Sequence, residues 1–259
     1  RVRPCNRVGA VKGVALSTFP GVKLVDLTHE IEPYNIHEGA VTLWLAAREF
    51  PPGTVFVAVV DPGVGTERRP LVVVTGNGQA FVGPDNGLFT LVMREFGVRS
   101  VRQITNRDYM RPGPISYSFH GRDIFVPTAS HLASGRPVEA VGPEVSDYVL
   151  LDIAPAQQTE EALTGEVILI DQYGNLQANI TGEMVRSFGL QFGDRIVVQV
   201  GDTRLESVWA NTYGDVPEGD DVAFLASTDL VEIAVNMGSA QERFGASLGS
   251  PVIITRAER

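Results

Sequence analysis

The order of apolar runs along about the first 150 residues constrains the fold of this chain more than any other feature. Apolar runs alternate there with segments of helical spacing, and glycine- or proline-rich turns separate them. Such alternation is typical of an α/β sheet covered by helices. It predicts strands in 22–28, 54–65 and, around a Gly-Asn-Gly turn, 70–88, and helices in 37–50, 87–97 and 123–135. We therefore expect residues 1–152 to form an α/β domain of sandwich type with a central, mostly parallel sheet.

The pattern changes after a polar segment that contains a proline. Residues 153–164 lack a strand pattern, and we expect them to be a linker. Short β-rich segments with turns between them follow, and only 184–190 and 239–245 have helical spacing. Residues 165–259 are therefore predicted to form a small antiparallel β-barrel domain.

Charge and composition exclude several classes of partner. Lys and Arg total 21 against 31 Asp and Glu, a net charge of −10, whereas nucleic-acid binders usually present a basic surface. From this acidic charge we expect no nucleic-acid partner. No run of about 18 apolar residues is present, so we also expect no membrane span. The single cysteine, Cys5, has no internal disulfide partner, and we expect a cytoplasmic protein.

The familiar cofactor and metal signatures are missing. No GxGxxG follows the first expected strand, and neither a P-loop nor a GxSxG motif occurs. The chain also lacks HxxxH and CxxC pairs and the spacing of an EF-hand loop. We expect no metal and no cofactor.

Asp61 is the first candidate for chemistry, because it stands where an apolar strand ends. In open α/β sheets ligands bind outside the carboxyl ends of the strands, and the glycines at 63 and 65 allow a close approach of the backbone. The alternative is an aspartate that only caps the turn.

Arg68 and His120 are the next candidates. Arg68 follows Asp61 by seven positions and precedes a second arginine; it is either solvated or pins a carboxylate through its fork of donors. His120 stands between Phe119 and the small Gly121, which leaves room beside the imidazole for a substrate. Its alternative is a loop histidine bonded to the backbone.

Further polar segments interrupt the apolar pattern. GPDNGL (83–88) is a turn signal, and DQYGN (171–175) and TYGDV (212–216) combine an aromatic, a glycine and polar groups. Ser227 and Glu232 are polar residues within an otherwise apolar stretch.

Taken together, these segments resemble one family closely. It is the S-adenosyl-L-methionine hydroxide adenosyltransferase family, the SAM hydrolases, which are relatives of the fluorinase and chlorinase enzymes. The matching stretches are VKGV, VDLTHEI, EPYNIHEGA, VVDPGVGTERR, GPDNGL, SFHGRDIF, DQYGNLQANI and LVEIAVNMGSA. They extend over nearly the whole chain, and VDPGVGT, GPDNG and FHGRDIF in this order are highly specific.

The resemblance implies an enzyme that hydrolyses S-adenosyl-L-methionine to adenosine and L-methionine. It implies an N-terminal α/β domain, a C-terminal β-barrel and a homotrimer whose ligand sites lie between subunits. The family's Asp–Arg–His set, which polarises a water, maps onto Asp61, Arg68 and His120. Positions that contact the substrate in relatives map onto Tyr34, Asp171, Asn175, Tyr213, Ser227, Glu232 and Val235.

The chemistry of the substrate agrees with this set. Methionine leaves a sulfonium centre as a neutral thioether, so no general acid is needed at the leaving atom. The reaction needs a water made more nucleophilic and aimed in line at the ribose 5′ carbon. The halogenating relatives have an aromatic residue at the position of Asp61, which makes the hydrolytic branch the better match.

The N-terminus departs from the family pattern. Cys5 and Arg7 stand near where relatives carry an Asp and a Tyr, and the family's ribose-binding Asp has no counterpart. Either the chain is truncated or ribose recognition is altered. Two other functions stay open: a protein that binds adenosine or S-adenosyl-L-methionine with little turnover, and a halide-dependent 5′-halogenase.

Overall fold

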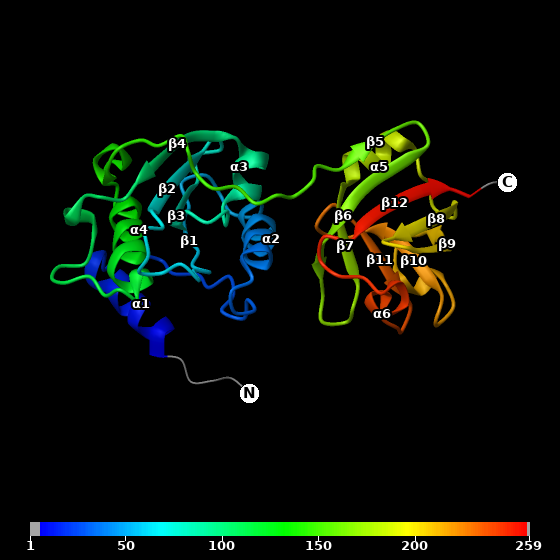
Figure 1. Cartoon of the computed structure of the whole chain (residues 1–259), viewed down its shortest axis with the longest axis horizontal. Helices are drawn as coiled ribbons and strands as arrows, with labels where there is room; N and C mark the ends of the chain where they lie inside the picture. The colour runs from blue at the N-terminus through cyan, green and yellow to red at the C-terminus, as the bar shows by residue number, and fades with distance from the viewer. Residues whose placement is uncertain (1–5, 258–259) are drawn as a thin grey trace. The chain divides into compact units, whose positions relative to one another are not determined.

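The computed structural model describes residues 6–257, which divide into two compact units (Figure 1). The first unit ends at Leu151 and the second begins at Asp152. Cys5, expected to be unpaired, lies outside the described residues. None of the helices between residues 6 and 257 combines the length and the apolarity that a bilayer crossing requires.

The first unit is a layered α/β structure. Its elements in chain order are α1 (Asn6–Thr18), α2 (Ile36–Ala47), β1 (Val55–Val57), β2 (Pro70–Thr75), β3 (Ala80–Pro84), α3 (Thr90–Phe96), β4 (Val98–Gln103), the 3₁₀ helix η1 (Arg107–Tyr109), the π-helix η2 (Gly121–Phe125), α4 (Val126–Ala133) and the 3₁₀ helix η3 (Val138–Val141). Helices α1 and α4 lie on one side of the sheet, and α2 and α3 lie on the other (Figure 1). Helices therefore lie on both sides of the sheet.

The sheet of this unit is mixed, and the expectation of a mostly parallel sheet was wrong. Its order is β1-β3-β2-β4, and among the strands that the structure describes here β1 and β3 are the one parallel pair. The reason is local: β2 and β3 form a hairpin around Gly76-Asn77-Gly78, where Gly78 has a positive φ of 84°. A connection this short joins only antiparallel strands.

The prediction of a buried strand at 22–28 was also wrong. No strand is assigned there, and Leu24, Val25 and Leu27 are exposed. A strand exists only where a neighbour pairs with its backbone groups, and the described sheet ends at β1 on that side of the order. Apolar periodicity alone does not supply the pairing partner.

Aromatic and branched side chains fill both faces of this sheet. On one face Phe56 stacks on Phe81 with ring centroids 4.9 Å apart, and Phe89 of the loop before α3 lies 6.1 Å from Phe81. On the other, Val72 and Val82 pack with Ile124 and Phe125 of η2 and with parts of α4. The packing of η2 on the sheet fixes the segment that follows His120.

The second unit is a closed β-barrel with two short helices. Its elements are β5 (Gln157–Gln158), β6 (Ala162–Ile170), β7 (Leu176–Thr181), α5 (Gly182–Phe188), β8 (Arg195–Val200), β9 (Thr203–Trp209), the 3₁₀ helix η4 (Tyr213–Asp215), β10 (Asp221–Leu225), β11 (Leu230–Val235), α6 (Ala240–Phe244) and β12 (Pro251–Arg256). The sheet order is β12-β8-β9-β10-β11-β7-β6-β5, and pairing of β12 with β6 closes it over seven strands. The predicted barrel is confirmed; β9 and β10 are its one parallel pair among the described strands.

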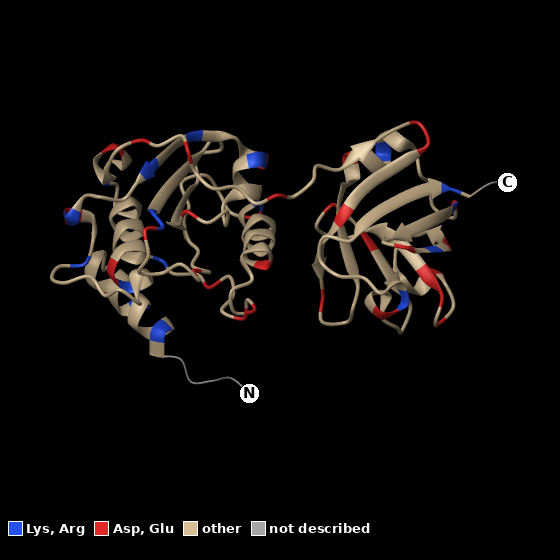
Figure 2. Ribbon diagram, viewed as in Figure 1, with Lys and Arg blue, Asp and Glu red and all other residues tan. Residues whose placement is uncertain are grey.

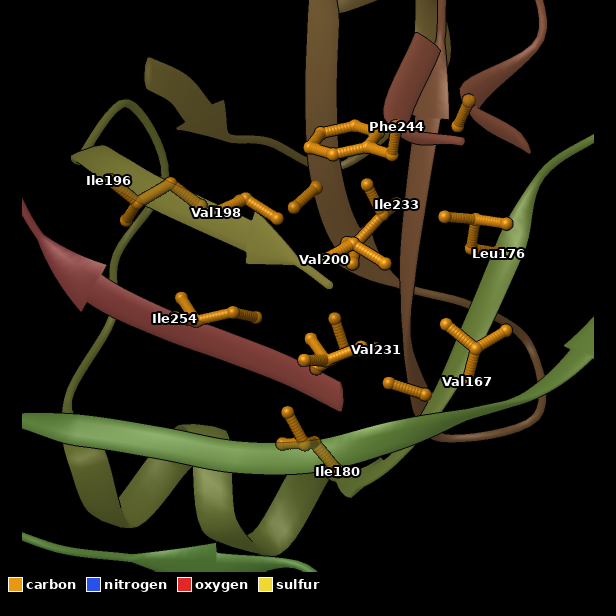
Figure 3. Close-up of a cluster of buried hydrophobic side chains, with 14 of the residues drawn as sticks. Val167, Leu176, Ile180, Ile196, Val198, Val200, Val231, Ile233, Phe244 and Ile254 are labelled. Atoms are coloured by element: carbon orange, nitrogen blue, oxygen red, sulfur yellow. The ribbon is translucent and has the colours of Figure 1, made fainter. Parts of the chain in front are cut away.

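The barrel interior is built from branched aliphatic side chains that alternate along the strands (Figure 3). Ile196, Val198 and Val200 of β8 point inward at every second position, as expected for a strand with one buried face. Residues 153–164, expected as a linker, contain β5 and the start of β6, which pair antiparallel.

Charged residues of both signs are interspersed over each unit (Figure 2). No long basic stretch stands out along the drawn ribbon, although the chain has 21 Lys and Arg.

Candidate active site

Asp61 is placed by the strand that precedes it. The backbone of 58–60 continues from β1 along β3, with the Ala58 amide donating to the Val82 carbonyl at 3.2 Å, and the Asn86 side chain donates to the Val60 carbonyl at 2.8 Å. The chain then turns, because the Val64 amide donates back to the Asp61 carbonyl at 3.3 Å. Asp61 therefore stands at the carboxyl end of β1, where ligands of α/β sheets bind.

The glycine-rich turn brings Arg68 back onto Asp61. Arg68 Nε donates to one carboxylate oxygen at 3.0 Å, and Nη2 donates to the other at 2.5 Å. Both side chains are almost fully buried, at 4% exposed for Asp61 and 7% for Arg68. The structure thus decides between the two sequence interpretations of Arg68: it pins a carboxylate with a bidentate fork.

His120 joins this pair although it is 52 positions away in the sequence. Arg68 Nη2 lies 3.0 Å from His120 Nδ1, and because a guanidinium only donates, Nδ1 is the acceptor. The neutral imidazole then carries its proton on Nε2. The ring of Phe125 lies beside both groups, 5.4 Å from the Arg68 guanidinium carbon and 6.4 Å from the His120 ring.

The environment keeps His120 neutral. Burial, and then the positive charge of Arg68, lower the pKa of the His120 imidazole below its ordinary value of 6.5, while Asp61 and Asp123 act in the opposite direction. Arg68 Nη1 is buried without a hydrogen-bond acceptor among residues 6–257. The Asp61–Arg68–His120 triad thus combines a neutral imidazole with a guanidinium that its own surroundings do not fully satisfy.

The loop before His120 packs against the glycine-rich turn. Gly65 has a φ of +80°, and a Cβ built on it would lie 2.3 Å from the carbonyl oxygen of Tyr117. Only glycine allows this approach. The two segments that carry the triad are therefore in direct backbone contact.

Tyr34 is in the same unit, but within residues 6–257 it forms no hydrogen bond or ring contact with the triad. It precedes Asn35, the N-cap residue of α2, and is 77% exposed with a positive φ of 72°. A tyrosine in this backbone region is strained, which is common at functional positions.

A second polar cluster lies in the barrel unit, and it contains four of the sequence candidates. The Tyr213 hydroxyl donates to one oxygen of Glu232, and Gln177 Nε2 donates to the other at 3.0 Å. Asp171 accepts from the Asn175 backbone amide at 3.0 Å and from its side-chain amide at 2.9 Å. Burial, then the bond to Glu232 and the nearby Asp171 charge raise the pKa of Tyr213, which keeps its hydroxyl protonated.

Sequence reasoning missed one member of this cluster, and two further candidates lie outside its hydrogen bonds. Gln177 is the missed residue; it faces Glu232 across the β7–β11 pair and also accepts from Thr228 at 3.3 Å. A polar residue inside DQYGNLQANI was the available signal. Ser227 is exposed in the β10–β11 turn, and Val235 is a buried residue of the barrel core.

Glu232 is 4% exposed, and the side chains that donate to it, Gln177 and Tyr213, are neutral rather than cationic. A buried carboxylate with neutral partners leaves a negative charge that attracts a cationic group. The barrel cluster is therefore suited to a positively charged small molecule. Among residues 6–257 no group of three or more His, Cys, Asp or Glu is arranged to hold a metal ion.

Comparison with known proteins gives concordant results along both units. Residues 5–142 match the model of the SAM hydroxide adenosyltransferase N-terminal domain, and residues 165–253 match that of the corresponding C-terminal domain. An (R)-S-adenosyl-L-methionine hydrolase of Thermus thermophilus is 40% identical over 251 residues, which cover 95% of this chain and 92% of that protein. A fluorinase of Actinopolyspora mzabensis is 30% identical over 97% of this chain and 93% of its own length.

A solved structure has the same fold. An uncharacterised conserved protein from Thermotoga maritima superposes with a TM-score of 0.90 at 38% identity, covering 97% of this chain and 96% of the other.

Proposed function

The chain belongs to the SAM hydroxide adenosyltransferase family, and from that premise we propose that it hydrolyses S-adenosyl-L-methionine to adenosine and L-methionine. The observation that carries the proposal is the buried Asp61–Arg68–His120 triad at the carboxyl end of β1. Relatives named as hydrolases of this substrate are 35–40% identical over most of the chain.

The reaction is a displacement at the ribose 5′ carbon. A water oxygen forms the new C5′–O bond while the C5′–S bond breaks, and the bonding pair goes to sulfur to give the neutral thioether of methionine. The attacking water loses one proton. The substrate cation and water therefore yield adenosine, L-methionine and a proton.

The triad is proposed to orient and polarise that water. Both carboxylate oxygens of Asp61 accept hydrogen bonds from Arg68, so Asp61 orients the guanidinium rather than contacting the substrate. Arg68 fixes Nδ1 of His120, and the Nε2–H of the imidazole is left to bond the water oxygen. A water held in place loses less freedom on reaching the transition state, which is worth several kcal/mol in well-oriented systems, about 7–11 at the most.

The barrel cluster is proposed to contribute the substrate contacts. Asp171 and Glu232 supply negative charge for the sulfonium and ammonium groups, and Tyr213 supplies an aromatic face. Tyr34, Asn175, Ser227 and the backbone at Val235 complete the proposed contacts. In keeping with the resemblance, we propose a homotrimer in which the barrel of one subunit serves the α/β unit of its neighbour, in the cytoplasm.

The activity test is product formation from S-adenosyl-L-methionine followed by chromatography, with His120→Ala as the control and particle mass measured by light scattering on the same sample. Adenosine release above the control is expected. Tight substrate binding in calorimetry without adenosine would instead indicate a binding protein. Formation of 5′-chloro-5′-deoxyadenosine in chloride buffer would assign the chain to the halogenating branch.

The pH dependence of the reaction follows from the lowered pKa of His120. Since the neutral imidazole is the form that accepts from Arg68 Nη2, protonation breaks this contact and activity is lost. Because the pKa of His120 is lowered below its ordinary value of 6.5, the acid limb of kcat/KM is expected to be centred below pH 6.5.

The control for this profile is His131→Gln. His131 also has its pKa lowered by burial, but it packs on the Tyr109 ring away from the triad. Its replacement should leave the acid limb of kcat/KM in place. An acid limb centred above pH 6.5 in the wild-type protein would contradict the assignment to His120.

A further inference from the structure

We propose that Asp123 is a positioning residue that holds the turn bearing His120 in the place where its imidazole meets Arg68. The inference rests on the proposed function, because His120 is catalytic only in that reaction. Asp123 belongs to the FHGRDIF motif, but its carboxylate makes no bond to the triad; it acts through the segments on either side of His120.

The carboxylate of Asp123 is completely buried, and each of its two oxygens accepts two hydrogen bonds. One oxygen accepts from Arg122 Nε at 2.7 Å and from Arg111 Nη1 at 3.3 Å. The other accepts from Arg122 Nη2 at 2.9 Å and from the Ser116 backbone amide at 2.9 Å. A buried carboxylate held by two guanidiniums and a backbone amide fixes every segment that supplies a donor.

These donors lie on both sides of His120. Arg111 and Ser116 belong to the loop before it, and Arg122 and Asp123 belong to η2, which follows it. The Asp123 backbone adds two bonds: its amide donates to the Phe119 carbonyl at 3.2 Å, and its carbonyl accepts from the Arg111 amide at 2.9 Å. The residues before and after His120 are therefore tied to one buried anchor.

The same anchor reaches the other half of the triad. Ser116, whose amide Asp123 holds, is next to Tyr117, whose carbonyl lies against Gly65 in the turn between Asp61 and Arg68. Releasing the loop at Ser116 would loosen this contact as well. The relative position of His120 and Arg68 thus depends on a carboxylate that bonds to neither.

Asp123 also acts on His120 by charge. The Arg122 bond, against the opposing effect of burial, lowers the pKa of Asp123 to about 2, so the carboxylate is ionised at every working pH. The charged groups that act on the His120 imidazole are Arg68, Asp61 and Asp123. Helix α1 also packs against η2, and its charged residue Arg7 lies over the Phe119 ring. Removal of the Asp123 charge by itself should lower the pKa of His120, whereas loss of the contact with Arg68 should raise it.

The test compares Asp123→Asn with Gln79→Ala in the full chain. Gln79 is 1% exposed and donates to the carbonyls of Ala47 and Phe50. It precedes Ala80, which pairs with Val55, so it lies where β1 begins, at the opposite end from Asp61. Both variants break a buried polar anchor, but only one anchor is tied to His120.

We expect Asp123→Asn to lower kcat by about 10-fold or more with little change in KM, since small misplacements of catalytic groups are costly in rate. Gln79→Ala should lower the melting temperature while kcat of the folded protein stays within about twofold. An NMR titration of the His120 imidazole, assigned with a His120→Gln variant, should show a changed pKa in Asp123→Asn, because this variant removes a charge near His120 and loosens its contact with Arg68, and no shift in Gln79→Ala.

Equal kcat losses in the two variants, or an unshifted His120 pKa in Asp123→Asn, would overturn the inference. If the wild-type protein releases no adenosine, the proposed function fails by itself, and the two His120 titrations alone decide the role of Asp123. If Asp123→Asn does not fold, Arg122→Gln replaces it, because that side chain is 30% exposed. A several-fold loss of kcat at unchanged KM is then expected, and an unchanged kcat would refute the proposal.

Discussion

Replacing Asp61 by asparagine is expected to lower kcat for adenosine release by about 10²–10⁴-fold, the range over which a positioned acid–base group contributes to catalysis. The carboxylate accepts from both Nε and Nη2 of Arg68, whereas an amide presents one acceptor and turns an NH₂ group toward the other donor. The guanidinium then loses its orientation and with it the contact to His120 Nδ1.

The matched control is Asp147→Asn. Asp147 pairs with Arg69, the neighbour of Arg68, but its side chain is 81% exposed. Exposed ion pairs contribute little, about 0–1 kcal/mol, so kcat should change by less than about twofold. Steady-state kinetics and circular dichroism on both variants separate loss of catalysis from loss of fold. Activity of Asp61→Asn within tenfold of wild type would remove the triad from the mechanism.

Replacing Phe81 by alanine is expected to lower the free energy of unfolding of the first unit by about 3–5 kcal/mol. Phe81 is fully buried on β3, stacks on Phe56 at 4.9 Å and contacts Phe89 at 6.1 Å. Its removal leaves a cavity beneath β3, which pairs with β1, the strand that leads to Asp61. Activity should therefore be lost at temperatures where the wild-type protein still works.

Each unit contains one of the two tryptophans, which makes the measurement specific. Trp44 is in α2 and Trp209 is in β9. In a Trp209→Phe background, fluorescence during urea unfolding reports the first unit alone. Val98→Ala, at a 42% exposed position of β4, is the control and should cost well under 1 kcal/mol. A loss of less than about 1 kcal/mol in Phe81→Ala would mean that the ring cluster does not hold the sheet together.

The sequence predicts local structure correctly where the residues that determine it are neighbours in the chain. Gly97 ends α3 with a positive φ of 69°, as its position after the helical pattern predicted. The Gly-Asn-Gly turn predicted the β2–β3 hairpin, and 184–190 and 239–245 contain most of α5 and α6. In each case a few neighbouring residues set the backbone conformation.

Sequence-based predictions of secondary structure fail where the structure depends on which distant segments pair. The apolar run 22–28 has strand-like composition, yet pairing is decided by a neighbour that the run itself does not encode. The helix α1 was not foreseen, because its residues carry little of the apolar periodicity that signals a buried helix face. The direction of strands in the first sheet likewise depends on chain connections rather than on strand composition.

The sequence by itself determined the family, the two-part order of the chain and the residue types of the triad, because motif spacing and turn residues are properties of adjacent positions. Only the tertiary structure decided that Arg68 donates two bonds to Asp61, that His120 accepts from the same guanidinium, and that the buried carboxylate of Asp123 accepts from residues on both sides of His120. The physical reason is that a bond between side chains 52 positions apart depends on how a sheet and a π-helix pack, and this packing depends on many side chains at once.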